Sequence, residues 1–463
     1  MTTKAALECG IKNKTRLMEH IVGQLLCLGT HTITGILKTC GRQFQDWSAD
    51  YRLYERGLAP THKLLTPVRA WACENTTGPI VVAMDDTCIR KRGRKVHGAK
   101  YFRDPLGPPF HTNLLFGQRF VQSSVAYQSP NGLARMIPVD WIHAPMPTKP
   151  GPKASDEERE AYKNARKTHN LSVVGSERMH HLRKAFDAQG AAERSLCMVV
   201  DGSYTNQTVL QNLPENTTLI GRIRSDAKLY HLPEKQPDKG RRRVYGERAL
   251  TPKELMQSKE IDWKPIKVFW GEGEQELEVK ELGPLRWRSA GEAHQLKMVC
   301  IAPTDYKLTK YGRLLHRSPA FLICTDPDMP IEQLVQQYLW RWDIEVNHRD
   351  EKTTLGVGDA QVRTVKAVQG ATGLPVAAYA MLLTAACQCQ KDKKNFEHVP
   401  KAHWQKKKSI RPTTPNLIRY LRYEVWNQGM NFSGFVGNMP PSTNPEKCNL
   451  PINSPIFYAD RHA

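Results

Sequence analysis

The chain has 463 residues, and 67 Lys and Arg against 46 Asp and Glu give it a formal net charge of +21 at pH 7. A chain of this length can bury a sizeable catalytic core and still carry one or two smaller modules, which excludes a peptide-like binder. So large a positive excess repels itself unless anions neutralise it. We therefore expect a polyanionic partner, nucleic acid first and a membrane surface second.

The sequence carries neither a membrane-spanning pattern nor a secretory signal. The longest apolar stretch, residues 374–387, is interrupted by Pro375 and is well short of the roughly 20 residues that a spanning helix needs. Residues 1–10 lack the apolar core and cleavage site of a signal peptide. The eleven cysteines lack the paired spacing of a zinc ribbon, which favours reduced thiols. We expect an intracellular protein.

The first residues predict an N-terminal helical module over 1–76. Residues 24–74 mix short helical patterns with aromatic side chains, and 75–79 break the pattern. A helix-turn-helix that reads DNA fits this segment, but packing alone is the commoner explanation of such a pattern.

Two predicted apolar strands each end in a carboxylate. Residues 80–84 precede Asp85 and Asp86, and 195–200 lead to Asp201, where Gly202 permits a turn. Open α/β sheets place ligand sites at such strand ends. More strands are predicted at 113–116, 120–127, 136–142 and 218–224, with helices at 156–167 and 174–186. The alternation predicts an α/β fold.

Beyond residue 225 the pattern changes to short alternating segments, which predict a β-rich insertion. A buried strand at 320–325 and a helix at 331–353 follow, and further helices are predicted at 376–389 and 411–423. The predicted domains are the helical module, the first part of a catalytic core (77–225), the insertion subdomain (226–319), the second part of the core (320–370), and a helical C-terminal region with a Pro- and Asn-rich tail (371–463).

One face of the predicted helix at 331–353 combines a carboxylate, two cations and a phenol. Tyr338, Arg341, Glu345 and Lys352 lie at offsets 0, 3, 7 and 14, within an arc of roughly 60°. This set suits a metal ion on the carboxylate with phosphates on the cations. Taken alone, Arg341 and Glu345 also fit an ordinary salt bridge four residues apart.

Together, Asp85, Asp201 and Glu345 predict a divalent-metal site. Two carboxylates 4 Å apart repel by about 4 kcal/mol at an effective dielectric constant of 20, and cations remove that cost. Ligation by oxygen alone favours Mg²⁺, with Mn²⁺ as a substitute. Two such ions can activate a water or a 3′-hydroxyl and stabilise the leaving oxygen of a phosphodiester.

The segment from Tyr338 to Lys352 resembles the Y-x2-R-x3-E-x6-K signature of the IS-four-like bacterial insertion-sequence transposases, a group of DDE enzymes. Residues 84–87 resemble that family's first motif, an apolar strand followed by D-x-T, and residues 200–204 resemble its second motif. The resemblance covers 80–363. It implies an RNase H-like core with a β-rich insertion before the glutamate.

The resemblance also implies an activity, which is cleavage of double-stranded DNA at the element ends and strand transfer into a target. By it, Asp85, Asp201 and Glu345 are the catalytic metal ligands, and Tyr338, Arg341 and Lys352 contact DNA. Because two ends must be joined, it implies a homo-oligomer on DNA, a dimer, in the bacterial cytoplasm and nucleoid. We choose Asp85 over Asp86 because D-x-T places the ligand two residues before Thr87.

Several other features stay open at this point. A flipped base could stack on a tryptophan of the insertion, although core packing is the more common role of such residues. His348 fits a structural role better than ligation. Three basic clusters are candidates for phosphate binding, although each alone is usually a solvated face. The tryptophans are Trp263, Trp270 and Trp287, and the clusters are 90–95, 241–243 and 406–408.

Two other functions compete with the transposase. One is an RNase H-like nuclease that hydrolyses DNA without transferring strands, and the glutamate-helix signature argues against it. The other is a catalytically silent DNA-binding regulator derived from a transposase. Loss of an acidic residue is the usual mark of such a protein, and all three carboxylates are present here.

Overall fold

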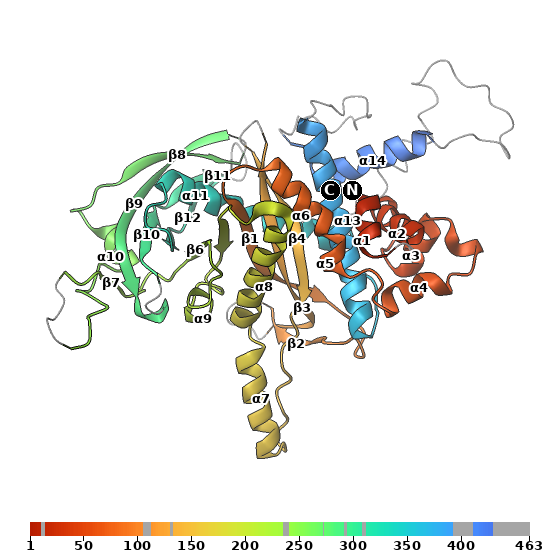
Figure 1. Ribbon diagram of the computed structural model, residues 1–463, viewed down its shortest axis with the longest axis horizontal. Helices are drawn as coiled ribbons and strands as arrows, with labels where there is room; N and C mark the ends of the chain where they lie inside the picture. The colour runs from red at the N-terminus through yellow and green to blue at the C-terminus, as the bar shows by residue number, and fades with distance from the viewer. Residues whose placement is uncertain are drawn as a thin grey trace.

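One large mixed β-sheet of 11 strands organises the chain, and helices cover both of its faces (Figure 1). The computed structural model describes residues 1–10, 14–104, 113–129, 133–234, 240–271, 273–290, 294–307, 312–391 and 411–428. The basic cluster 406–408 and the Pro- and Asn-rich tail therefore lie outside the described residues. The predicted α/β class is confirmed.

Five strands form the central part of this sheet, in the order β4-β3-β1-β5-β6. β1 runs parallel to β5, and β5 runs parallel to β6, whereas β3 is antiparallel to its neighbours β1 and β4. With helices on both faces, this arrangement is consistent with an RNase H-like core. The strands are β1 (Ile80–Arg90), β3 (Leu114–Gln128), β4 (Ala134–His143), β5 (Leu196–Val200) and β6 (Thr217–Arg222).

The strands of the predicted insertion continue the same sheet. β13 pairs with β6 along one edge and with β10 along the other. β10 in turn pairs with β9, and β9 pairs with both β7 and β8. This pairing satisfies the backbone groups that an exposed edge of β6 would leave open. The boundaries of the predicted subdomain stay a prediction. The insertion strands in the main sheet are β7 (Leu229–His231), β8 (Lys264–Trp270), β9 (Gly273–Trp287) and β10 (Leu296–Ile301), and β11 (Thr304–Lys307) and β12 (Leu314–Arg317) form a separate small sheet. β13 (Ala320–Cys324) belongs to the second part of the predicted core, and β2 (Lys100–Arg103) pairs with β3.

Alternation along β1 assigns its side chains to the two faces of the sheet. Val82 and Met84 belong to the apolar cluster that contains Leu182 of α8, whereas Val81 and Ala83 belong to the cluster that contains Leu334 of α11. The helices on these two faces and at the far end of the sheet are α7 (Asp156–Thr168), α8 (Leu171–Phe186), α9 (Gln207–Leu210), α10 (Pro252–Gln257), α11 (Ile331–Trp340) and α12 (Trp342–Thr353), with short turns at Arg42–Phe44, Asp187–Ala191 and Arg288–Ala290.

The N-terminal helices pack around one long helix, α13 (Val365–Lys391). This helix is long and apolar enough to cross a membrane, but 89% of its apolar window is buried inside the protein, so packing accounts for its composition. It continues through Pro375, where the sequence predicted a helix only from residue 376. The surrounding helices are α1 (Thr2–Glu8), α2 (Lys14–Leu26), α3 (Ile33–Thr39), α4 (Ser48–Glu55), α5 (Thr61–Leu64), α6 (Thr66–Asn75) and α14 (Thr414–Gln428).

Candidate active site

Asp85 and Asp201 lie side by side on neighbouring parallel strands. Met84 of β1 pairs with Val200 of β5, so the residue that follows each of them stands at the same level of the sheet. Neighbouring strands are about 4.8 Å apart. β5 ends there, whereas β1 continues to Arg90 because it stays paired with β3. The sheet therefore places these two carboxylates together at one edge.

The two adjacent acids of β1 have different neighbours. Asp85 lies two residues after Ala83 in β1, so its side chain points to the same face of the sheet, which α11 and α12 cover. Its Oδ2 atom lies 3.4 Å from Nη1 of Arg341. Burial raises the pKa of Asp86, and the neighbouring Arg119 opposes that rise. Of these two acids, Asp85 makes the contact with Arg341, and Asp86 interacts electrostatically with Lys352.

Arg341 links Asp85 to Glu345. Its Nη2 atom lies 3.3 Å from Oε1 of Glu345, while Nη1 faces Asp85. The sequence predicted one helix over 331–353, but the structure divides it at Arg341 into α11 and α12. At the junction Arg341 N–H donates to Tyr338 and Ile344 N–H donates to Arg341, each spanning three residues instead of four. The tighter turn leaves the guanidinium between the two carboxylates.

The pKa of Asp85 is raised to about 7, because burial and the negative charges of Asp201 and Asp86 together outweigh the opposing effect of Arg341. For Arg341, burial alone lowers the pKa, but Tyr338 and the two acids that it contacts outweigh burial and raise it. Asp85 is thus a carboxylate whose ionised form depends on nearby positive charge.

The loop after β5 fixes the orientation of Asp201. The backbone N–H of Ser203 donates to Oδ1 of Asp201 at 2.9 Å, and the Ser203 hydroxyl donates to Oδ2 at 3.2 Å. The Thr205 hydroxyl donates to the Asp201 carbonyl oxygen at 2.8 Å. The completely buried Tyr204 anchors the loop against α8. The sequence analysis did not identify Ser203 or Thr205, although a serine two residues after an aspartate is a turn signal.

Tyr338 and Lys352 complete the group around the end of β1. The Arg341 guanidinium carbon lies 5.8 Å from the centre of the Tyr338 ring. Burial lowers the pKa of Lys352, while Cys88 and Asp85 raise it, so its ammonium group lies within electrostatic range of the β1 acids. The four signature positions and the two aspartates therefore surround one edge of the sheet.

Two further polar residues of α12 lie behind this group. His348 is 7% exposed, and burial lowers its pKa to about 3, so it is neutral at pH 7. Glu351 is 1% exposed, and burial raises its pKa well above the ordinary value. Burial therefore favours the protonated form of Glu351. The structural role predicted for His348 agrees with its burial, whereas nothing in the sequence pattern identified Glu351.

The donor set fits a hard divalent cation, because every candidate ligand is a carboxylate. A cation beside Asp85 would stabilise its ionised form, which burial disfavours. Within the described part of the chain, however, no three His, Cys, Asp or Glu side chains stand close enough to form a ready-made metal site. Glu345 is held by Arg341 and its side chain is 39% exposed, so it has room to turn.

The three tryptophans of the predicted insertion are all partly buried. Trp263 and Trp287 pack against the larger apolar cluster. Lys280 lies over the ring of Trp263 at 4.7 Å, and Arg317 lies over that of Trp270 at 4.2 Å. These contacts favour the packing interpretation over base stacking.

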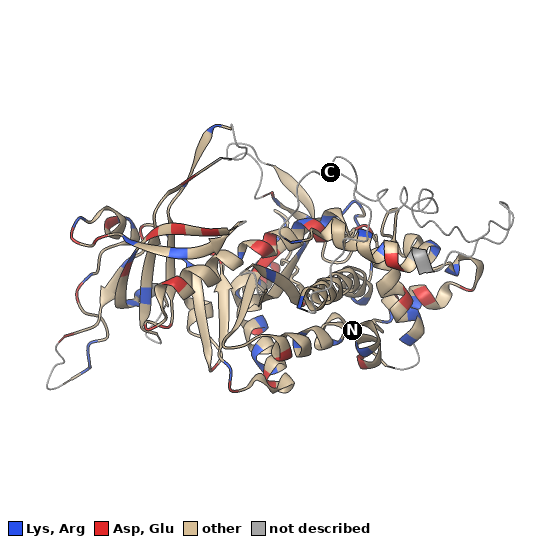
Figure 2. Cartoon of the chain, turned by 90° about the horizontal axis from the view of Figure 1, so that it is seen from above, with Lys and Arg blue, Asp and Glu red and all other residues tan. Residues whose placement is uncertain are grey.

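Positive charge is spread over many elements of the chain rather than gathered on one of them (Figure 2). Within the first predicted basic cluster, Lys91 is only 6% exposed and donates to the carbonyl oxygens of Gly358 and Ala360. This lysine therefore has a structural role, and the cluster presents fewer free cations than its sequence indicates.

Comparison with known proteins agrees with this geometry. A family model described as DDE superfamily endonuclease matches residues 7–290, more than half of the chain, including both strand-end aspartates but not the α12 glutamate. None of the curated proteins matches the chain. The family consists of DNA-cleaving enzymes that use divalent metal ions. The chain belongs to the DDE superfamily endonucleases, as this match shows, and its fold and the placement of Asp85 and Asp201 agree with that family.

Proposed function

We propose that this endonuclease is the transposase of an insertion sequence, of the IS-four-like type with the Y-R-E-K signature. It would cut double-stranded DNA at the ends of the element and join those ends to a target. The observation that carries the proposal is the Arg341 guanidinium, which contacts Asp85 at 3.4 Å and Glu345 at 3.3 Å beside the strand that ends at Asp201. The signature residues thus meet the strand-end acids.

In this proposal Asp85, Asp201 and Glu345 hold two Mg²⁺ ions, which Mn²⁺ can replace. When bound, the ions activate the attacking oxygen and stabilise the leaving oxygen of the phosphodiester. Ser203 keeps both oxygens of Asp201 oriented through its two hydrogen bonds. The exposed Glu345 side chain completes the set by leaving Arg341, which neutralises the acids until then.

Arg341 and Lys352 are proposed to receive the phosphates of the element end, with Tyr338 beside them. A guanidinium offers several N–H donors in one plane, which suits phosphate oxygens. The Nε atom of Arg341 is buried and makes no hydrogen bond, so this side chain has a donor to spare. Binding of DNA would then release Glu345, which couples substrate binding to assembly of the site.

The protein is proposed to act as a homodimer on DNA in a bacterial cytoplasm, because two element ends have to be joined in one complex. The net charge of +21 supports a nucleic-acid partner. A nuclease that does not transfer strands and a catalytically silent regulator are the competing functions. The three functions leave DNA in different states, so one assay of the DNA products separates them.

That assay is Mg²⁺-dependent cleavage and joining of DNA that carries the element's own ends, with intact protein and Glu345→Gln. We expect the intact chain to cut and join, and the variant to lose both reactions while it still binds DNA. Glu193→Gln is the matched control, since this exposed carboxylate precedes β5 at the opposite end of the strand. Cleavage without joining identifies a nuclease, and binding alone identifies a regulator.

A further inference from the structure

The helix α12 has two polar sides. Glu345 and Lys352 lie on the catalytic side. Asp343, Asn347 and Asp350 lie at offsets 0, 4 and 7, within an arc of roughly 60° on the opposite side of the helix, which we call the support side. Asn347 and Asp350 are 2% and 5% exposed. The support side is therefore packed against the protein rather than left to solvent.

Residues 411–414, which lead into α14, hold the support side near both of its ends. Two nitrogens of the Arg411 guanidinium donate to the two carboxylate oxygens of Asp343, with Nη1 at 2.9 Å from Oδ2. The Thr414 hydroxyl donates to Oδ2 of Asp350 at 2.6 Å. The partners are 68 and 64 positions apart in the sequence, so only the folded chain brings them together.

A buried asparagine holds the middle of the support side. Nδ2 of Asn347 donates to the Met136 carbonyl oxygen of β4 at 2.9 Å, and its Oδ1 accepts from the Tyr379 hydroxyl of α13 at 3.3 Å. The same hydroxyl lies 3.1 Å from that of Thr414. Tyr379 is 1% exposed. Because these groups are shielded from water, the loss of one leaves its partner unpaired at a cost in free energy.

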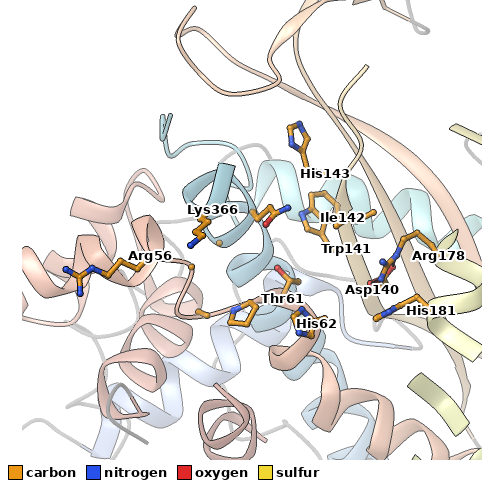
Figure 3. Close-up of a pocket in the computed structure, with 15 residues that line it drawn as sticks. Arg56, Thr61, His62, Asp140, Trp141, Ile142, His143, Arg178, His181 and Lys366 are labelled. Atoms are coloured by element: carbon orange, nitrogen blue, oxygen red, sulfur yellow. Dashed lines mark hydrogen bonds and ion pairs between the residues drawn. The ribbon is translucent and has the colours of Figure 1, made fainter. Parts of the chain in front are cut away.

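The strand β4, to which Asn347 is bonded, is anchored farther along its length. Both oxygens of Asp140 accept hydrogen bonds from Arg178 of α8, each at 2.7 Å, and Figure 3 shows the two side chains together. Nε1 of Trp141 donates to the Thr372 hydroxyl of α13 at 3.1 Å. Asp140 and Trp141 are 1% and 4% exposed. The support side of α12 is thus bound to a strand that two other helices hold in place.

The contacts on the support side matter because α12 does not continue α11. The two helices are separated at Arg341, so the direction of α11 does not by itself set the direction of α12. Asp343 stands in the first turn of α12, two residues before Glu345. A displacement of this turn would move Glu345 with it. The Glu345 side chain is 39% exposed and has room to turn, but it reaches one defined place only from a fixed backbone.

We propose that the pair of Asp343 and Arg411 positions Glu345 for metal binding. Neither residue touches the cation, because both act through the placement of the first turn of α12. A guanidinium that contacts both oxygens of a carboxylate fixes orientation as well as distance, and the side chains of this pair are only 16% and 29% exposed. Loss of the partners that orient a metal ligand lowers metal affinity roughly 10- to 100-fold. The inference rests on the proposed role of Glu345 as a ligand.

The test is calorimetric titration of Mg²⁺ into the full chain bound to DNA with pre-cut element ends, so that cleavage releases no heat. Asp343→Asn and Arg411→Gln should each raise the dissociation constant of Mg²⁺ at least about tenfold, and Arg411→Lys, which keeps the charge, should raise it less. Single-turnover cleavage of uncut ends by Asp343→Asn should recover at high Mg²⁺ concentration, with unchanged DNA affinity. Glu332→Gln is the matched control, since this exposed carboxylate lies in the first turn of the neighbouring α11, and it should leave Mg²⁺ binding unchanged.

Glu345→Gln shows through which residue the pair acts. When Asp343→Asn is added to Glu345→Gln, we expect no further loss of Mg²⁺ affinity. Equal weakening with and without the Glu345 carboxylate, an unchanged Mg²⁺ affinity in Asp343→Asn, or a cleavage defect that high Mg²⁺ does not repair would each overturn the inference. If the proposed ligand role is itself wrong, Glu345→Gln binds Mg²⁺ as tightly as the unsubstituted protein does. That result differs from the other three, so the two proposals fail separately.

Discussion

Arg341 contacts Asp85 across 256 positions of sequence, with Nη1 of the arginine 3.4 Å from Oδ2 of the aspartate. The contact joins the break between α11 and α12 to the middle of β1. Because the same guanidinium also contacts Glu345, the helix and the strand hold their acids in one place before any cation or DNA binds.

Replacing Arg341 with Lys should reduce DNA cleavage by at least about a hundredfold while the protein stays folded. A lysine keeps the charge but cannot contact two carboxylates through separate nitrogens. The measurement is single-turnover cleavage, with circular dichroism to establish the fold. Arg349→Lys is the control, because Arg349 lies on the same helix, is 65% exposed and contacts only Asp350 among described acids. Equal loss in both variants would contradict the special role of Arg341.

The choice between the two acids of β1 is tested by Asp85→Asn and Asp86→Asn. Only Asp85 contacts Arg341, so we expect its variant to abolish Mg²⁺-dependent cleavage and to weaken Mg²⁺ binding measured by calorimetry. Asp86→Asn should retain cleavage within about tenfold, since one lost charge near a metal changes affinity without removing a ligand. The opposite order of effects would transfer the ligand role to Asp86.

The sequence predicted the central strands and the acids at their ends because buried parallel strands are continuous apolar runs, and a run of this kind ends visibly at Asp85 and Asp201. It also predicted the α12 face, since helical spacing fixes which side chains share a side. The contact between Arg341 and Asp85 depends on how α12 docks on the sheet, and no local pattern encodes that docking.

Other features were missed for related reasons. The β-rich segment continues the main sheet because β13 pairs with both β6 and β10, and strand partners distant in sequence leave no periodic signal. The long helix α13 passes through Pro375 because packing on both sides compensates the lost hydrogen bond.

Gly175→Ala should destabilise the protein and disturb the Asp201 loop. A Cβ at this position would lie 2.5 Å from Cδ1 of Tyr204, a completely buried side chain that cannot move aside freely. We expect the free energy of unfolding to fall by about 1–3 kcal/mol, with slower cleavage because Tyr204 follows Asp201 by three residues. Urea denaturation measures the first effect. Gly29→Ala, with nothing within 4 Å of the added Cβ, should leave both properties unchanged.

The contribution of His143 to the free energy of unfolding should decline as the pH falls below about 6.5, whereas Asp85, with its pKa raised to about 7, acts in the opposite direction. Burial and, to a smaller extent, His97 together lower the pKa of His143 to about 4, whereas an unfolded histidine titrates near 6.5. Between these values the unfolded state binds the proton and the folded state does not, so acid favours unfolding. His143 alone should reduce the free energy of unfolding by about 1 kcal/mol between pH 7.5 and 5.5. Buried His348, with its pKa near 3, acts in the same direction.

Urea denaturation at the two pH values measures the decline. His143→Phe keeps a ring beside Phe120, and relative to the unsubstituted protein it should be about 1 kcal/mol more stable at pH 5.5 than at pH 7.5. An unchanged difference would mean that His143 is already protonated in the folded protein at pH 5.5.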